Sequence, residues 1–298
     1  MTVTAEGLAP SHDVSLGFTV PGRDVRGRIV RLDTSLAAIL AAHDYPAPLA
    51  ATLAEALVTT ALVGATLRDT IGGLTLQAQS SGPLNLLVCD WNAGALRGYL
   101  QGAPETPMGD LEAMFGQGHL AVTLDQTDTN ERYQGIVPLE GAGIAAAIEQ
   151  YFRASEQIPT LIRVHLGGDP AQGWFAGGIL LQYLPRGEDG STRRFAEDDG
   201  EPEPADWQHI RSLAGTITRD ELASPDLSPE ALLWRLFHEE EVRLFPGAAP
   251  VRGCRCTAEH ITDVLTRFPE SERADMRGED GTIGVDCQFC SRVWRIHA

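Results

Sequence analysis

Short runs of alternating hydrophobic and polar residues fill positions 14–184, and helical patterns interrupt them only at isolated places. In GHLAVTLD, Leu120, Val122 and Leu124 alternate with smaller or polar residues, which is the period of a strand with one buried face. Because the predicted strands follow one another in runs, the pattern favours a mainly antiparallel α+β domain over a doubly wound parallel sheet. The other strand candidates are RGRIVRLD, GGLTLQAQ, GPLNLLVCDW, GALRGYL, YQGIVPL, TLIRVHL and WFAGGILLQYL.

Three segments of the same region show helical patterns. Thr34 is placed to cap a helix through SLAAILAAHDY, which Pro46 is expected to end. Residues 48–67, PLAATLAEALVTTALVGATL, are rich in Ala and Thr and include Glu55, so we expect a core helix there rather than a membrane span. A third helix, GAGIAAAIEQYFRASEQ, has one apolar stripe, and Pro159 is expected to stop it.

The composition changes at residues 185–206, which contain eight acidic residues, three prolines and three glycines. Such a segment is typical of a solvated linker. A helix is predicted after it, over about 206–223, with Asp206 as its cap. The next helix begins at SPEALLWRLFHEEE, with Ser228 as its cap and Pro229 at the first helical position. Its apolar face consists of Leu232, Leu233, Leu236 and Phe237.

These changes along the chain predict three parts with an α+β fold overall. The first is an N-terminal α/β domain over residues 1–198, and the second is a helical linker domain over residues 199–249. The third part, residues 250–298, is a small C-terminal segment that we call the tail.

The charge of the chain narrows the classes of partner. A formal net charge of −18 opposes non-specific binding to nucleic acid or to anionic membranes. The first residues, MTVTAEGLAPSHDVSL, lack the basic start and the apolar run of a secretory signal, so the cytoplasm is the expected location. In that compartment, clustered cysteines bind metal or perform redox chemistry more often than they form permanent disulfides.

Four of the five cysteines lie in the tail, in the order C-x-C, thirty intervening residues and C-x-x-C. Two such pairs at opposite ends of one small segment predict a four-sulfur zinc site, with one Zn²⁺ per chain in the reduced state. The tail has few large apolar residues, so its folding is expected to depend on the metal. The predicted ligands are Cys254, Cys256, Cys287 and Cys290.

Three other residues are of types that can bind a metal, but their positions in the sequence do not indicate a ligand. His260 and His297 lie near the cysteines in sequence, but four sulfurs already fill a tetrahedral shell, so we expect both histidines at the surface. Cys89 stands alone in the strand candidate LLVCDW and is expected to be a buried small hydrophobe.

Oxidation gives the same four cysteines a second chemistry. Each pair can close a local disulfide, and a disulfide sulfur is a poor zinc ligand, so the metal would be released. The ring closed across C-x-C is small and strained, which makes the disulfide easier to reduce and the change reversible. A purely structural zinc knuckle remains open as an alternative.

Other functions are weighed against this chemistry. A thiol–disulfide oxidoreductase places C-x-x-C at the start of a helix, whereas GTIGVDCQFCSRVWRI is typical of a hairpin. A nucleic-acid-binding zinc module needs a basic stripe, which this acidic chain lacks. The large domain shows no P-loop and none of the motifs G-x-G-x-x-G, H-E-x-x-H or G-x-S-x-G. We therefore predict no enzymatic activity.

The cysteine spacing and several longer stretches together resemble one family, the redox-regulated, zinc-binding 33 kDa heat-shock chaperones of bacteria. The similarity extends over nearly the whole chain in one order. It departs after the second cysteine, where Thr257 to His260 replace a common Ser-Arg-Glu-Arg, but the ligand set is unaffected. The matching stretches are GHLAVTLD, YFRASEQIPT, GGILLQYLP and LLWRLFHEEEVRLF.

The resemblance implies an ATP-independent holdase that is inactive when reduced and zinc-bound. It implies that oxidation forms two disulfides among the four cysteines, releases zinc, unfolds the tail and linker and yields a form that binds unfolding client proteins, usually as a homodimer. No nucleic acid or membrane is implied as a partner. We hypothesise that the exposed linker face then contacts the client, through Leu232, Leu233, Leu236 and Phe237.

Overall fold

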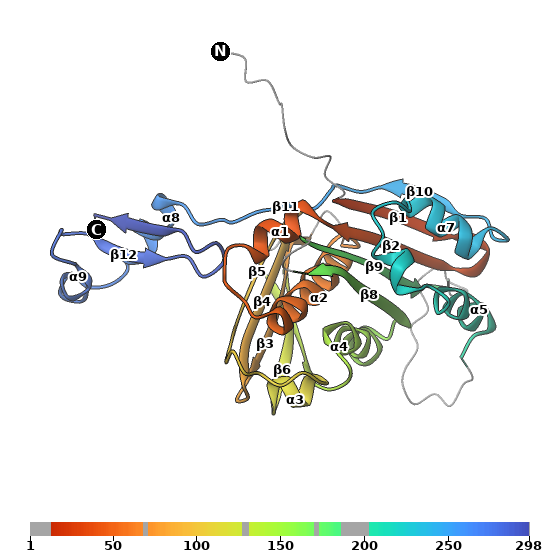
Figure 1. Cartoon of the computed structure of the whole chain (residues 1–298), viewed down its shortest axis with the longest axis horizontal. Coiled ribbons are helices and arrows are strands. Elements are labelled where there is room, and N and C mark those ends of the chain that lie inside the picture. Colours follow the sequence, from red (N-terminus) through yellow and green to blue (C-terminus); the bar gives the residue numbers. More distant parts are fainter. Residues whose placement is uncertain (1–12, 68–70, 127–130, 170–172, 186–202, 298) are drawn as a thin grey trace, which may run out of the picture.

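The fold consists of two β-sheets on either side of one long helix, with the tail projecting from the body (Figure 1). The structure is a computed structural model that describes residues 13–67, 71–126, 131–169, 173–185 and 203–297. The predicted acidic linker at 185–206 lies largely outside the described residues.

The first sheet has five strands in the order β10-β1-β2-β9-β8, and every neighbouring pair is antiparallel. Long neighbouring strands that run in opposite directions agree with the predicted α+β class. The bounds are β1 Val14–Val20, β2 Val25–Leu32, β8 Thr160–Asp169, β9 Gly173–Tyr183 and β10 Arg243–Pro246.

The second sheet has six strands in the order β11-β5-β4-β3-β6-β7. Its pairings are antiparallel except at one edge, where the two-residue β11 runs parallel to β5. The predicted antiparallel architecture is therefore confirmed with this one exception. The bounds are β3 Ile71–Ser80, β4 Leu84–Asn92, β5 Ala95–Gly102, β6 Gly118–Gln126, β7 Arg132–Pro138 and β11 Val251–Arg252.

Helix α2, Ala47–Gly64, is the core helix of the molecule. It is long and apolar enough to cross a membrane, yet 78% of it is buried inside the protein. It contacts strands of both sheets, and Leu53 and Leu57 are fully buried among them. Its small Ala and Thr side chains let two sheets approach one helix closely, so the predicted core helix is confirmed.

The predicted ends of the first helix are wrong. Helix α1 spans Thr34–Leu40 and ends well before Pro46. No side chain of its own caps it; instead the Asp13 carboxylate accepts hydrogen bonds from the Ser35 amide at 3.0 Å and from the Ser35 hydroxyl at 2.5 Å. The cap therefore comes from the start of β1, and a local capping pattern cannot show this.

Two other predicted helices are shorter than expected. Helix α4 spans Ile144–Tyr151 and continues as a π-helical turn that ends at Gln157, which has a left-handed backbone with φ of 57°. The helix predicted over 206–223 is two helices, α5 Ala205–Ala214 and α6 Arg219–Leu222. Asp206 does not cap α5; a capping box begun by Thr218 starts α6 instead.

Helix α7, Pro229–Phe237, begins as predicted, with the Ser228 hydroxyl accepting a hydrogen bond from the Ala231 amide at 3.1 Å. Its apolar face packs on the five-stranded sheet, on the side opposite α2. The ring of Phe237 lies 5.9 Å from that of Phe18 in β1. All four residues of the predicted face are buried: Leu232, Leu233, Leu236 and Phe237.

The tail is a hairpin with two short helices. Strand β12, Ile283–Asp286, pairs antiparallel with β13, Val293–Ile296, as the sequence predicted. Helices α8, Ala258–Leu265, and α9, Glu270–Met276, precede the hairpin. The buried core is small, as expected, and consists of Ile261, Leu265, Ile283 and Ile296. The remaining short helix of the molecule's body, α3, spans Leu111–Phe115.

Candidate metal centre

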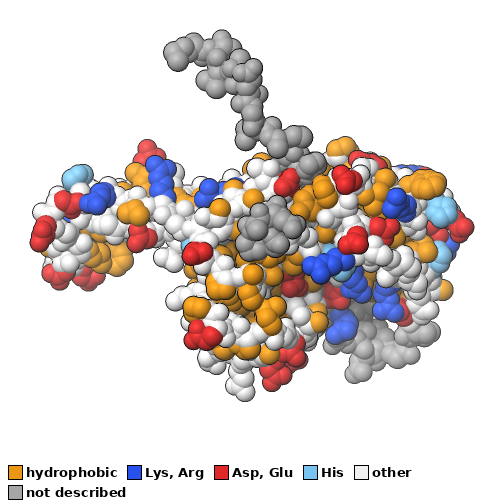
Figure 2. All heavy atoms as spheres, in the orientation of Figure 1, with side chains coloured by type: hydrophobic (Ala, Val, Ile, Leu, Met, Phe, Trp, Pro, Cys, Tyr) orange, Lys and Arg blue, Asp and Glu red, His pale blue; other side chains and the backbone are white. Residues whose placement is uncertain are grey.

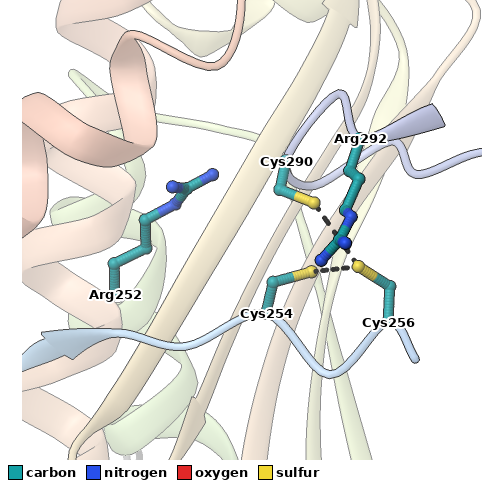
Figure 3. Close-up of a pocket in the computed structure, with 5 residues that line it drawn as sticks. All are labelled: Arg252, Cys254, Cys256, Cys290 and Arg292. Carbon is teal, nitrogen blue, oxygen red and sulfur yellow. Dashed lines mark hydrogen bonds between the residues drawn. The ribbon is translucent and has the colours of Figure 1, made fainter.

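The four tail cysteines meet at one point, and Figure 3 shows three of them, Cys254, Cys256 and Cys290. Cys254 and Cys256 lie in the extended segment after β11, and Cys287 and Cys290 lie in the turn between β12 and β13. Their sulfur atoms all lie within 4.8 Å of one another, and all four are free thiols. The closest pairs are Cys254–Cys256 at 3.3 Å, Cys254–Cys287 at 3.5 Å and Cys256–Cys290 at 3.4 Å.

These distances fit a metal-sized cluster rather than disulfides. A tetrahedron with metal–sulfur bonds of about 2.3 Å has sulfur–sulfur edges of about 3.8 Å. A disulfide would bring two sulfurs to about 2.05 Å. The three sulfur pairs named above are slightly closer than the edges of such a tetrahedron and much farther apart than a disulfide. His260 and His297 are exposed and lie outside the group, as predicted.

The hairpin turn holds the second pair of thiols in place. The Cys287 carbonyl accepts hydrogen bonds from the amides of Cys290 at 3.3 Å and Ser291 at 2.8 Å. Ser291 takes a left-handed backbone with φ of 54°. Because this C-x-x-C pair lies in a turn and not at the start of a helix, it lacks the helix dipole that activates the thiol of an oxidoreductase.

The surroundings of the cluster favour negative charge. Arg252 and Arg292 line the same depression of about 370 Å³ as three of the cysteines. The guanidinium carbon of Arg292 lies 4.1 Å from the centre of the Trp294 ring. The indole Nε1 of Trp294 is buried without a hydrogen-bond partner among the described residues. A donor set of four thiolates beside cations suits a soft divalent metal.

The thiols differ in how readily they lose a proton. Partial burial opposes ionisation of Cys254, but hydrogen bonds from the Cys256 backbone and the neighbouring thiols outweigh it and lower its pKa to about 7. Burial, reinforced by the bond to Cys254, raises the pKa of Cys256 to about 12. Burial also raises the pKa of Cys287. The Cys254 thiolate therefore forms easily, whereas Cys256 and Cys287 lose their protons readily only with a cation among the sulfurs.

The tail contacts the body through residues that the sequence analysis missed. Arg255 donates to the Asp90 carboxylate of β4 at 2.9 Å, and the Phe289 ring packs edge-on against Tyr99 of β5, with the ring centres 4.9 Å apart. Both tail residues are enclosed between a pair of cysteines. Their position inside the cysteine motifs was the one available signal in the sequence, but a cysteine motif by itself does not indicate what its middle residues contact.

The acidic and basic side chains of the tail are interspersed over the face shown in Figure 2.

The structure keeps the other predicted residues away from the metal centre. Cys89 lies in β4 of the six-stranded sheet with its side chain fully buried, and burial raises the pKa of its thiol well above the ordinary range. The four apolar residues proposed for client contact lie on α7, which packs on the other sheet. Their role in client binding stays a prediction.

Comparisons with known proteins agree on one family. A family model described as "Hsp33 protein" matches residues 13–297. A 33 kDa chaperonin of Caulobacter vibrioides is 39% identical over 308 aligned positions, which cover 99% of this chain and 98% of that protein. A 33 kDa chaperonin of Escherichia coli is 36% identical and is matched over 94% of its length.

A solved structure has the same fold. The crystal structure of the 33 kDa chaperonin from Thermotoga maritima matches with a TM-score of 0.77, over 96% of this chain and 95% of that one. The sequence identity in this match is 23%, so the similarity concerns the arrangement of the elements.

Proposed function

Because this chain belongs to the Hsp33 family of chaperones, we propose that it is an ATP-independent holdase whose activity is controlled by the oxidation state of its tail. The observation that carries the proposal is the convergence of four free thiols within 4.8 Å in a segment with only a small apolar core. The chaperone role follows from the family, and the redox control is our inference from the thiols.

In the reduced state, we assign Cys254, Cys256, Cys287 and Cys290 as ligands of one Zn²⁺. Zinc bound by four thiolates supplies folding free energy on the order of 10–16 kcal/mol in small modules. Four buried apolar side chains supply far less than such a segment needs to fold alone. The reduced tail is therefore folded because its thiolates are held together.

Oxidation converts each pair of thiols to a disulfide. In closing one pair of thiolates, one S–S bond forms and two electrons leave the sulfurs. Hypochlorous acid takes these two electrons together with one proton from solvent and ends as chloride and water. The sulfurs then no longer act as thiolate ligands, and the tail loses what kept it folded. Because the disulfide across C-x-C is strained, cellular thiols reverse the change.

We further propose that the chain works as three parts, with a core domain at 1–198, a linker domain at 199–249 and a redox-switch domain at 250–298. Loss of the folded tail loosens the linker and exposes the α7 face that now packs on the five-stranded sheet. That face, from Leu232 to Phe237, then holds unfolded client, and the oxidised protein acts as a homodimer.

The test is light scattering from a thermally unfolding client protein in the presence of this chain. One sample is reduced and zinc-loaded, and the other is treated with hypochlorite. We expect only the oxidised sample to suppress aggregation, and a variant with serine at all four tail cysteines not to respond to hypochlorite. Equal protection by the reduced and oxidised wild-type samples would show a constitutive chaperone with a structural metal site.

A further inference from the structure

We propose that the β4–β5 edge of the six-stranded sheet is an inhibitory docking surface for the chain's own tail, and that Arg255 and Phe289 hold the tail on it. The effect on chaperone activation rests on the proposed function above. The docking itself does not, because it concerns contacts within the reduced protein.

Arg255 binds a carboxylate that is already buried. The Asp90 side chain is 7% exposed and accepts hydrogen bonds from Thr75 at 2.7 Å and from Arg97 at 2.7 Å. Arg255 adds a third contact, 2.9 Å from Oδ2 of the same carboxylate. Because Thr75 and Arg97 belong to the same sheet as Asp90, the carboxylate is held in place whether or not the tail is present, and it presents a fixed anion to Arg255.

Phe289 makes the second contact on the neighbouring strand. Its ring stands edge-on to Tyr99, and the guanidinium carbon of Arg97 lies 3.9 Å from the ring centre. Arg97 therefore joins the two contacts, because it pairs with Asp90 and also covers Phe289. Because the same guanidinium takes part in both contacts, the two anchors reinforce each other.

Backbone pairing and a polar contact complete the docked surface. The amides of Val251 and Gly253 donate to the carbonyls of Gly94 at 2.9 Å and Leu96 at 2.8 Å, which makes β11 the edge strand beside β5. Gly253 packs so closely that an added Cβ would lie 2.5 Å from that of Ala95. On the other side of the cysteine turn, the Ser291 hydroxyl lies 3.2 Å from Nδ1 of His43.

Arg255 and Phe289 are each enclosed by a pair of cysteines, so docking of the tail depends on the oxidation state of those thiols. In an extended C-x-C segment the two cysteines point to one side and the middle residue points to the other. The sulfurs of Cys254 and Cys256 turn to the cluster (Figure 3), and Arg255 turns to Asp90. Closing these sulfurs from 3.3 Å to about 2.05 Å requires a different backbone at Arg255. Oxidation therefore weakens the anchor and frees the edge of β5.

The experiment compares two arginine variants of the full-length, reduced and zinc-loaded protein. Arg255→Ser removes the contact with Asp90, and the carboxylate keeps its bonds to Arg97 and Thr75, so the sheet stays folded. Arg267→Ser is the matched control, because Arg267 is an exposed arginine of the tail that lies away from the sulfurs and forms no ion pair with any residue that the structure describes. The first measurement is hydrogen exchange at the Val251 and Gly253 amides.

We expect Arg255→Ser to speed exchange at these two amides by roughly threefold to fivefold, the size of a partly exposed ion pair, and Arg255→Lys to restore most of the protection. Arg267→Ser should leave exchange unchanged. Phe289→Ala should act in the same direction as Arg255→Ser, and the exposed Val293→Ala should have no effect. Equal exchange in the Arg255 and Arg267 variants would overturn the docking proposal.

The second measurement is the hypochlorite concentration that gives half-maximal protection of a client. We expect Arg255→Ser to lower this hypochlorite concentration by a similar factor relative to Arg267→Ser. If exchange changes as expected but no variant ever protects a client, the docking surface stands and the proposed function fails. If wild type is redox-controlled and Arg255→Ser shifts neither readout, the docking proposal alone fails.

Discussion

At the scale of single residues, a buried carboxyl group accepts hydrogen bonds from backbone amides that are distant in sequence. Glu55 of α2 accepts hydrogen bonds from the Ala145 amide at 3.1 Å and from the Ile144 backbone, and so caps the start of α4. Gly143 makes room for it, because an added Cβ there would lie 2.5 Å from the carboxylate. Burial raises the pKa of Glu55 above its ordinary value, although the two backbone bonds oppose the shift.

This raised pKa predicts a pH dependence of stability. A carboxyl whose pKa is higher in the folded state contributes fully below the unfolded pKa, and the contribution is lost as pH rises through the folded pKa. Glu55→Gln keeps an acceptor and does not titrate. We therefore expect the free energy of unfolding of the variant, relative to wild type, to rise by roughly 1 kcal/mol or more from pH 4.5 to pH 8.

Urea unfolding of the core across this range measures the difference. Glu112→Gln is the control, because Glu112 is an exposed glutamate in the first turn of α3. A constant difference between the Glu55 variant and wild type at every pH would show that the carboxyl does not have a raised pKa in the folded protein.

At the scale of elements, the apolar face of α7 holds the helix on the five-stranded sheet. Phe237 is 1% exposed and lies against Phe18, whereas Trp234 on the opposite face is 69% exposed. The helix lies between the core and the tail in sequence, and β10, which follows it, is an edge strand of the five-stranded sheet. We therefore expect loss of packing on this one face to free the helix from the sheet.

Truncation of that face should release the linker without oxidation. We expect Phe237→Ala to cost about 3–5 kcal/mol and to give the reduced protein partial client protection. Trp234→Ala, on the same helix, should change stability by no more than about 0.5 kcal/mol and should not activate the reduced protein. Thermal unfolding and client light scattering of the two variants measure both effects. If Phe237→Ala is as stable and as inactive as Trp234→Ala, α7 is not the element that controls activity.

The strands were predictable from the sequence because alternation is a local property, as β6 shows. The helix ends were not, since α1 is capped by Asp13 and α4 by Glu55, both distant in sequence. The metal ligands were predictable because two closely spaced cysteine pairs in one small segment are by themselves typical of a zinc site. Arg255 and Phe289 were missed because their partners, Asp90 and Tyr99, are specified by tertiary packing and by no local pattern.

At the scale of the whole molecule, the described residues form three apolar clusters of very different size. The largest surrounds α2 between the sheets, the second lies under α5 and α7, and the third is the small core of the tail. The first two are large enough to be self-sufficient, whereas the third is too small to fold a segment of this length alone. We therefore expect a stable body and a tail whose folding depends on a metal held by the four thiols.

Metal removal should unfold the tail selectively. We expect a strong zinc chelator at neutral pH to abolish hydrogen-exchange protection of α8, β12 and β13, since the small core of the tail cannot fold without the metal. The amides of α2 should stay protected, and added Zn²⁺ should restore the tail. Protection of the tail that survives complete metal removal would show that its apolar core suffices.

If the thiol cluster controls chaperone activity, one titration with an oxidant should change metal binding and client protection together. Hypochlorite is added stepwise to the reduced, zinc-loaded protein, and each sample is divided between a chromophoric zinc assay and light scattering from an unfolding client. We predict that zinc release and client protection rise together over the same range of oxidant and that a thiol reductant with Zn²⁺ reverses both. Full client protection while the zinc is still bound would contradict the account.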